Sequence, residues 1–148
     1  MAFSGAKLAA ARLAAGMTQE QLARSIDSDQ TRVSEWERGL FSPRPEQVPA
    51  LAAAVAVKPL ELLDIPAEGP DLEAFRLAAG LSLQAIAAAV ETSVSRYRRM
   101  ERGERLEPPP DDLIDRLADV LSLSSDTIRT AIDVARQAAA TRHQTRGT

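Results

Sequence analysis

Apolar residues recur along this chain at the spacing that gives a helix one buried face. Val33 and Trp36 stand three positions apart, and a stripe from Ile128 to Ala135 repeats at i, i+3, i+4 and i+7. Side chains with this spacing project from the same face of a helix. Glycine, proline and short polar residues interrupt the apolar pattern at short intervals. The pattern therefore predicts an all-α chain of short helices joined by tight turns.

Polar residues and glycines mark where these helices begin and end in the first half of the chain. Thr18 and Gln21 have the spacing of a capping box, in which each side chain binds the backbone N–H of the other residue. Asp29 is suited to cap the next helix, and Gly16 and Gly39 suit positions just past a helix C-terminus. We expect helices over residues 6–15, from 18 to a turn at 27–28, over 29–38, from Pro45 onward, and a short one from Pro59.

The segment 18–39 returns 64 positions later as 82–103. Both copies follow the same five residues, Arg-Leu-Ala-Ala-Gly, and both end in Glu-Arg-Gly. A repeat of this length predicts two small domains built on one plan. In the second half we expect helices over residues 71–79, 82–90, 93–102, one after the prolines 108–110, and one over 125–140. The expected domains are 1–64 and 71–140, the latter with an extended last helix, with a linker at 65–70 and a flexible basic tail at 141–148.

Composition and charge narrow the class of protein. The chain has 148 residues, no Cys and a net charge of −3. Disulfides and thiol chemistry are therefore excluded, and no apolar stretch is long enough to span a bilayer, so we expect a soluble, cytoplasmic protein. A net negative charge is unfavourable for binding phosphates, but the charge is segregated. Five arginines lie within residues 96–105, whereas acids gather at 111–119.

The run from Arg12 through Gly16 and Thr18-Gln19 to Glu37-Arg38-Gly39 resembles the phage-repressor (Cro/XRE-type) helix-turn-helix family. The resemblance covers residues 8–63 and returns over 72–128. It implies two tandem five-helix lambda-repressor-like domains in a sequence-specific transcriptional regulator bound to the nucleoid, by family tendency a repressor. In this family the third helix enters the major groove of double-stranded DNA. Here those helices are 29–38 and 93–102.

The resemblance also implies which side chains meet DNA. Gln is suited to adenine, Glu to cytosine and Arg to guanine, whereas contacts to phosphates fix the register. The residues expected to read bases are Gln30, Thr31, Ser34, Glu35, Val94, Ser95, Arg98 and Arg99. The residues expected to contact phosphates are Thr18, Gln19, Arg32, Arg38, Arg44, Ser82, Arg96, Arg102 and Arg105.

The second copy departs from the family pattern at two of these positions. Leu83 stands where the first copy has Gln19, and Val94 stands where it has Gln30. One interpretation is that Val94 touches a thymine methyl while the arginines read guanines or hold phosphates. The other is that the second domain has given up base reading and supplies affinity or an interface. The sequence leaves both open.

Two ion pairs implied by the family join the first helix of each domain to the third. Arg12 is expected to pair with Glu37, and Arg76 with Glu101. We interpret both pairs as structural because they would lie behind the reading face. Trp36 is interpreted as a core residue, since it shares a helical face with Val33.

The sequence contains no glycine-rich phosphate loop, no metal-ligand spacing and no nucleophile–base set. We therefore expect no enzyme, no cofactor and no metal. The apolar stripe 128–135 either packs into the core or mediates a homodimer through the C-terminal helix. The rival to a DNA-binding regulator is a protein-interaction module, such as an antitoxin or adaptor, with weak or no specific DNA binding.

Overall fold

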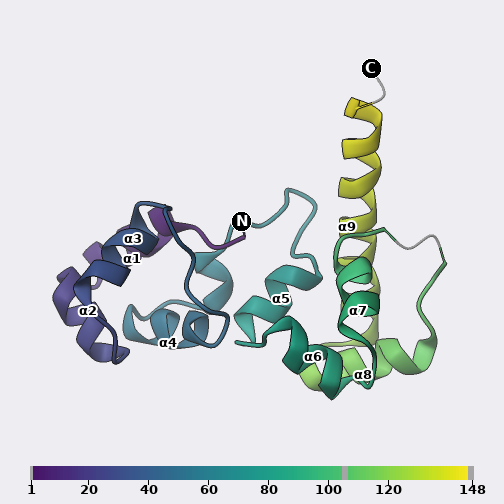
Figure 1. Cartoon of the computed structure of the whole chain (residues 1–148), viewed down its shortest axis with the longest axis horizontal. Helices are drawn as coiled ribbons and strands as arrows, with labels where there is room; N and C mark the ends of the chain where they lie inside the picture. Colours follow the sequence, from purple (N-terminus) through teal and green to yellow (C-terminus); the bar gives the residue numbers. More distant parts are fainter. Residues whose placement is uncertain (1, 105–106, 147–148) are drawn as a thin grey trace. The chain divides into compact units, whose positions relative to one another are not determined.

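The computed structural model describes residues 2–104 and 107–146, and of residues 143–146 it describes the backbone only. Every regular element in this part of the chain is a helix, so the prediction of an all-α fold is confirmed (Figure 1). An isolated antiparallel bridge joins Phe3 to Leu63. The helices are α1 (Gly5–Ala14), α2 (Gln19–Ser25), α3 (Gln30–Glu37), α4 (Gln47–Ala54), the 3₁₀-helix η1 (Pro59–Leu62), α5 (Leu72–Ala78), α6 (Leu83–Ala89), α7 (Val94–Glu101), α8 (Asp111–Leu121) and α9 (Ser125–Arg146).

The chain forms two compact units. Unit 1 comprises Met1–Ile65 with Leu77–Gly80, and unit 2 comprises Pro66–Arg76 with Leu81–Thr148. Of the linker expected at 65–70, Ile65 is thus grouped with unit 1 and residues 66–70 with unit 2. The fifth helix expected in unit 1 is the single 3₁₀ turn η1, and α4 begins at Gln47 rather than at Pro45 because residues 45–46 form a turn.

The core of unit 1 lies where α1, α2, α3, α4 and η1 meet. Val33 and Trp36 of α3 are both buried, as their shared face predicts. They pack with Leu8, Leu22 and Leu51, which are fully buried. The bridge from Phe3 to Leu63 brings the start of the chain beside the end of η1. Helices too short to be stable alone are held together by this shared core.

The core of unit 2 is built around Tyr97 of α7 and the apolar face of α9. Ile128, Ala131 and Ile132 are buried and belong to the same cluster as Tyr97. The stripe 128–135 is therefore core, and it is not available as the homodimer interface that the sequence left open. The helix continues to Arg146, so residues 141–146 extend α9 instead of forming the expected flexible tail. Figure 1 shows the second half of α9 projecting beyond the other helices of its unit.

Among the described residues, no single helix is both long and apolar enough to cross a membrane. The pair α5 and α6 reaches that length and composition only when taken together, with a bend of 97° between the two helices. Leu72 and Ile86, from the two members of this pair, are buried in the core of unit 2.

Candidate nucleic-acid interface

The two copies fold into the same helix–turn–helix. The bounds of α2 and α3 coincide with those of α6 and α7 after a shift of 64 positions. In each turn one acidic residue takes the left-handed conformation, Asp27 at φ 54° and Glu91 at φ 58°. Side chains cap the second helix of each pair: Asp29 accepts from the backbone N–H of Arg32, and Ser93 plays the same role in the second copy. The local signals in the sequence therefore place both second helices.

Behind each of these helices lies a nearly buried ion pair. Arg12 Nε and Nη2 donate to the two carboxylate oxygens of Glu37 at 2.7 and 2.9 Å. Arg76 Nε and Nη2 donate to the two carboxylate oxygens of Glu101 in the same way, at 2.8 and 2.9 Å. A third hydrogen bond runs from each guanidinium to the backbone, to the carbonyl of Met17 and of Leu81 respectively. Two parallel charge-assisted bonds with this geometry fix both side chains in place.

These pairs also raise the pKa of both arginines. The hydrogen bond to Glu37 raises the pKa of Arg12. Burial alone would lower the pKa of Arg76, but its hydrogen bond and ionic contact with Glu101 outweigh burial and raise it. Both guanidinium groups therefore stay charged, and each keeps its ion pair with the glutamate beside it.

In unit 1 a glutamine connects the ion pair to the reading face. Gln19 Nε2 donates to Glu37 Oε1 at 3.1 Å, and Gln30 Nε2 donates to Gln19 Oε1 at 3.5 Å. We call these two contacts the Gln19 bridge. Gln19, expected to hold a phosphate, thus has its amide engaged with protein groups on both sides. Unit 2 has Leu83 at the equivalent position, so its ion pair has no such connection.

The base-reading residues expected on α3 lie on its outer side. Gln30 and Thr31 are exposed, and Ser34 and Glu35 are half-buried. Two arginines expected to contact phosphates lie on the same helix or directly after it. Arg32 is exposed, with its Nε 3.8 Å from Oδ2 of Asp29. Arg38 Nε donates to the carbonyl of Ser34 at 3.4 Å.

On α7 the structure separates the expected readers. Ser95, Arg98 and Arg99 are exposed. Val94 is half-buried and packs against the core of unit 2, so much of its side chain is unavailable to a base. The expected thymine contact by Val94 is therefore disfavoured, because packing uses its apolar surface.

The other residues expected to contact DNA phosphates differ in whether their side chains already make hydrogen bonds within the protein. The hydroxyls of Thr18 and Ser82 accept the backbone N–H of Gln21 and Ala85 as helix caps. Each hydroxyl still keeps its own proton to donate to a phosphate. The other expected ligands in the described part of the chain are exposed arginines, namely Arg44, Arg96 and Arg102. Arg105 lies outside the described residues.

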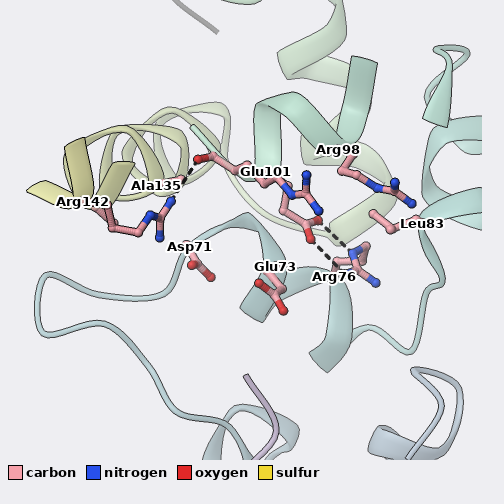
Figure 2. Close-up of a pocket in the computed structure, with 10 residues that line it drawn as sticks. Asp71, Glu73, Arg76, Leu83, Arg98, Glu101, Ala135 and Arg142 are labelled. Atoms are coloured by element: carbon pink, nitrogen blue, oxygen red, sulfur yellow. Dashed lines mark hydrogen bonds and ion pairs between the residues drawn. The ribbon is translucent and has the colours of Figure 1, made fainter. Parts of the chain in front are cut away.

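A polar pocket in unit 2, absent from the sequence-based expectations, lies beneath α7. It has a volume of about 300 Å³ and is lined by side chains of α7, α9 and the start of the unit (Figure 2). Asp71, Glu73 and Arg142 face it, together with Arg98 of α7 and Arg102, the residue after α7. Burial raises the pKa of Glu73, and the nearby carboxylates of Glu101 and Asp71 raise it further. Comparing the repeats could have pointed to Asp71 and Glu73, since the first copy has Lys7 and Ala9 there.

In the described part of the chain, no group of three or more His, Cys, Asp or Glu side chains is arranged to hold a metal ion. Among the described residues, exposed arginines are instead concentrated on α7 and at Arg102, directly after it. Arg96, Arg98, Arg99 and Arg102 take part in none of the salt bridges found among the described residues. Such a face suits an extended anionic partner.

Comparison with protein families agrees with this geometry. Residues 8–62 match the family model described as helix-turn-helix, and residues 69–131 match a second model, described as helix-turn-helix domain. The two units are therefore helix-turn-helix domains, of the kind found in DNA-binding regulators. The chain is a tandem XRE-type helix-turn-helix protein, and the two matches together span most of its length. No curated protein and no solved structure matches it significantly.

Proposed function

We propose that this protein is a sequence-specific regulator of transcription that binds double-stranded DNA through α3 and α7, and that it represses by occupying its site. One observation carries the proposal: α7 presents three exposed arginines and is followed directly by the exposed Arg102, while its single acid, Glu101, is turned inward onto Arg76. A carboxylate on the outer face would repel phosphates. Its sequestration leaves that face wholly positive, although the chain as a whole is negative.

Within this proposal each unit recognises a different DNA sequence. In unit 1, Gln30 reads adenine and Glu35 accepts from cytosine, both from the outer side of α3. In unit 2, Arg98 and Arg99 fork to guanine, while Arg96 and Arg102 hold phosphates. Each recognition helix reads its own short motif, so one chain would cover two half-sites about ten base pairs apart.

A homodimer through α9 is a secondary proposal with a restricted surface. The inner stripe of the helix is occupied by the core, so contact between copies would use the exposed part near residues 137–142. The mass of the protein in solution, from light scattering at increasing concentration, tests it. A constant monomer mass would sink this part of the proposal and leave DNA binding untouched.

A second candidate function, a protein-interaction module, is favoured by one separate observation. Leu40 and Phe41, immediately after α3, are 57% and 62% exposed. Two adjacent large apolar side chains on a surface are suited to a protein partner. If this is their role, replacing both by Ser removes partner binding and leaves DNA binding unchanged.

The experiment that tests the leading proposal is selection of bound duplexes from a random pool, using the full-length protein at near-physiological salt. Recovery of two motifs at a fixed spacing is the expected result. Recovery of one short motif would restrict reading to one unit. Absence of any enrichment, or binding that vanishes steeply with salt for every sequence, would overturn sequence-specific regulation.

A further inference from the structure

The polar pocket of unit 2 is surrounded by charged groups that the first repeat lacks. Asp71 and Glu73 stand where unit 1 has Lys7 and Ala9. Arg98 stands where unit 1 has Ser34. The two units share their helix–turn–helix plan, so Glu73 and Arg98 are additions to that plan. Asp71 also has a structural role, because its carboxylate accepts the backbone N–H of Ala74 at 3.0 Å and caps α5.

One part of the pocket wall attracts positive charge. Arg76 is already paired with Glu101, so it does not balance the charges of Asp71 and Glu73 on this side of the pocket. Neither carboxylate takes part in a salt bridge found among the described residues. Burial and the neighbouring carboxylates already disfavour the charged form of Glu73. A bound cation would relieve this cost.

The rest of the wall attracts negative charge. Arg98 lines the pocket from α7, and Arg142 lines it from α9 (Figure 2). Arg102, the residue after α7, lines the pocket as well. Arg142 Nη2 donates to the backbone carbonyl of Arg102 at 3.4 Å, which fastens the extension of α9 beside the end of α7. Gly103 abuts the backbone of Ala135, so the two helices approach too closely there for a side chain between them.

A buried hydroxyl lies near the same charges. Tyr97 replaces Val33 of the first repeat, which adds a hydroxyl at a buried position. The Oη atom has no hydrogen-bond partner of ordinary geometry in the described part of the chain. Burial raises the pKa of Tyr97, and the negative charge of Glu101 raises it further. Tyr97 itself does not line the pocket. Buried polar groups are rarely left without a partner.

We propose that this pocket binds a small zwitterion of the free α-amino-acid class. Its carboxylate is held by Arg98 and Arg102, and its ammonium group by Asp71 and Glu73. A volume of about 300 Å³ lies at the lower end for small-molecule sites and suits a ligand of this size. Occupancy withdraws Arg98 and Arg102 from the outer face of α7 and thereby weakens DNA binding, a consequence that rests on the proposed function.

The first test measures ligand binding without DNA. Thermal unfolding and calorimetric titration of the full-length protein are run with each free L-amino acid and with its N-acetyl and amide derivatives. One or more amino acids should raise Tm, because a ligand that binds only the folded state stabilises it. Both derivatives, each lacking one charge, should lose the effect. Failure of every amino acid to bind, or equal binding of either derivative, would overturn the proposal.

The repeat supplies variants that should fold. Glu73→Ala and Arg98→Ser each install the residue that unit 1 carries at the same position, and each should weaken ligand binding at least about tenfold. Arg99→Ala is the matched control, because Arg99 lies on the same helix but does not line the pocket. Unchanged affinity in Glu73→Ala and Arg98→Ser would place the ligand elsewhere.

The second test measures affinity for the selected duplex with and without the amino acid that binds. Weaker DNA binding in the wild type, with no change in Glu73→Ala, supports the coupling. Ligand binding without any effect on DNA affinity overturns the coupling alone. Ligand binding by a protein that enriches no DNA overturns the proposed function and leaves the pocket assignment standing.

Discussion

Arg12 and Glu37, far apart in sequence, form a two-pronged ion pair at 2.7 and 2.9 Å, and Arg76 and Glu101 repeat it at 2.8 and 2.9 Å. In each unit the Glu belongs to the closing Glu-Arg-Gly of the recognition helix. The pair turns this carboxylate inward while the Arg beside it stays exposed. One short motif thus joins two helices and sets the charge of the outer surface.

Removing the acid of this pair should destabilise the protein strongly. Glu101→Ala leaves the buried guanidinium of Arg76 unpaired, and we expect a loss of about 3–5 kcal/mol in the free energy of unfolding. Urea unfolding followed by circular dichroism measures it. Arg129→Ala, which removes only exposed ion pairs with Asp111 and Asp126, should cost no more than about 1 kcal/mol. Similar losses in the two variants would contradict a structural role for the buried pair.

Gly103 and Gly39 provide a matched test of close helix packing. Both end a recognition helix at a similar left-handed φ, 71° and 75°. A Cβ on Gly103 would overlap the backbone of Ala135 and Arg136, whereas one on Gly39 would meet nothing within 4 Å. Gly39→Ala should therefore cost only the backbone strain, about 1–2 kcal/mol. Gly103→Ala should cost a further 1–3 kcal/mol or so from overpacking, measured by urea unfolding. Equal losses of unfolding free energy in the two variants would show that α9 moves aside to accept the added methyl group.

The buried carboxylate of Glu73 should make stability depend on pH. Its pKa is raised above the ordinary value of 4.5, so at a pH between the unfolded and folded pKa values the folded state holds a proton that the unfolded state has released. Stability should therefore fall as pH rises above 4.5 through the folded pKa. Glu73→Gln should be more stable than the wild type at pH 7, and the difference should disappear below about pH 4. Unfolding free energies across this pH range decide it, and a difference that is constant with pH would exclude the titration of Glu73 as its cause.

The Gln19 bridge should orient Gln30 for base reading. Gln19→Leu installs the residue found at the equivalent position of unit 2, so the fold should tolerate it, but Gln30 loses its partner. Discrimination at one base pair should weaken by roughly tenfold, within the usual range for a bidentate contact. Binding to single-base variants of the selected duplex measures this. Gln30→Ala should relax the same base pair, and the double variant should add little to either single one. If Gln19→Leu instead weakened discrimination at a different base pair from Gln30→Ala, Gln19 would not act by orienting Gln30.

Arg38 should contribute affinity without sequence preference. Arg38→Ala should weaken binding to all duplexes alike and lower the salt slope by about one, as expected for one lost phosphate contact. Binding isotherms at several salt concentrations test this. Arg129→Ala removes the same charge from α9 and should leave the slope unchanged. A change in preference at a single base pair would reassign Arg38 as a reader.

The sequence by itself determined the features that depend on near neighbours. Caps such as Thr18 and Asp29 and the helix-ending glycines are local signals, and they located α2, α3, α6 and α7 within about one residue. The repeat gave two units of one plan, and the resemblance named the two ion pairs. The helix ends need only helical periodicity and local hydrogen bonds, whereas the ion pairs rest on the family resemblance alone.

Only the tertiary structure decided which faces remain free. The stripe 128–135 had the same periodicity whether it met its own core or a second copy, and packing against Tyr97 settled it. Val94 likewise became a partly buried residue once α7 was packed. The polar pocket joins side chains from Asp71 to Arg142, which no local pattern relates. Long-range burial and charge neighbours arise only when the helices are assembled, because the core determines which side chains each helix turns inward.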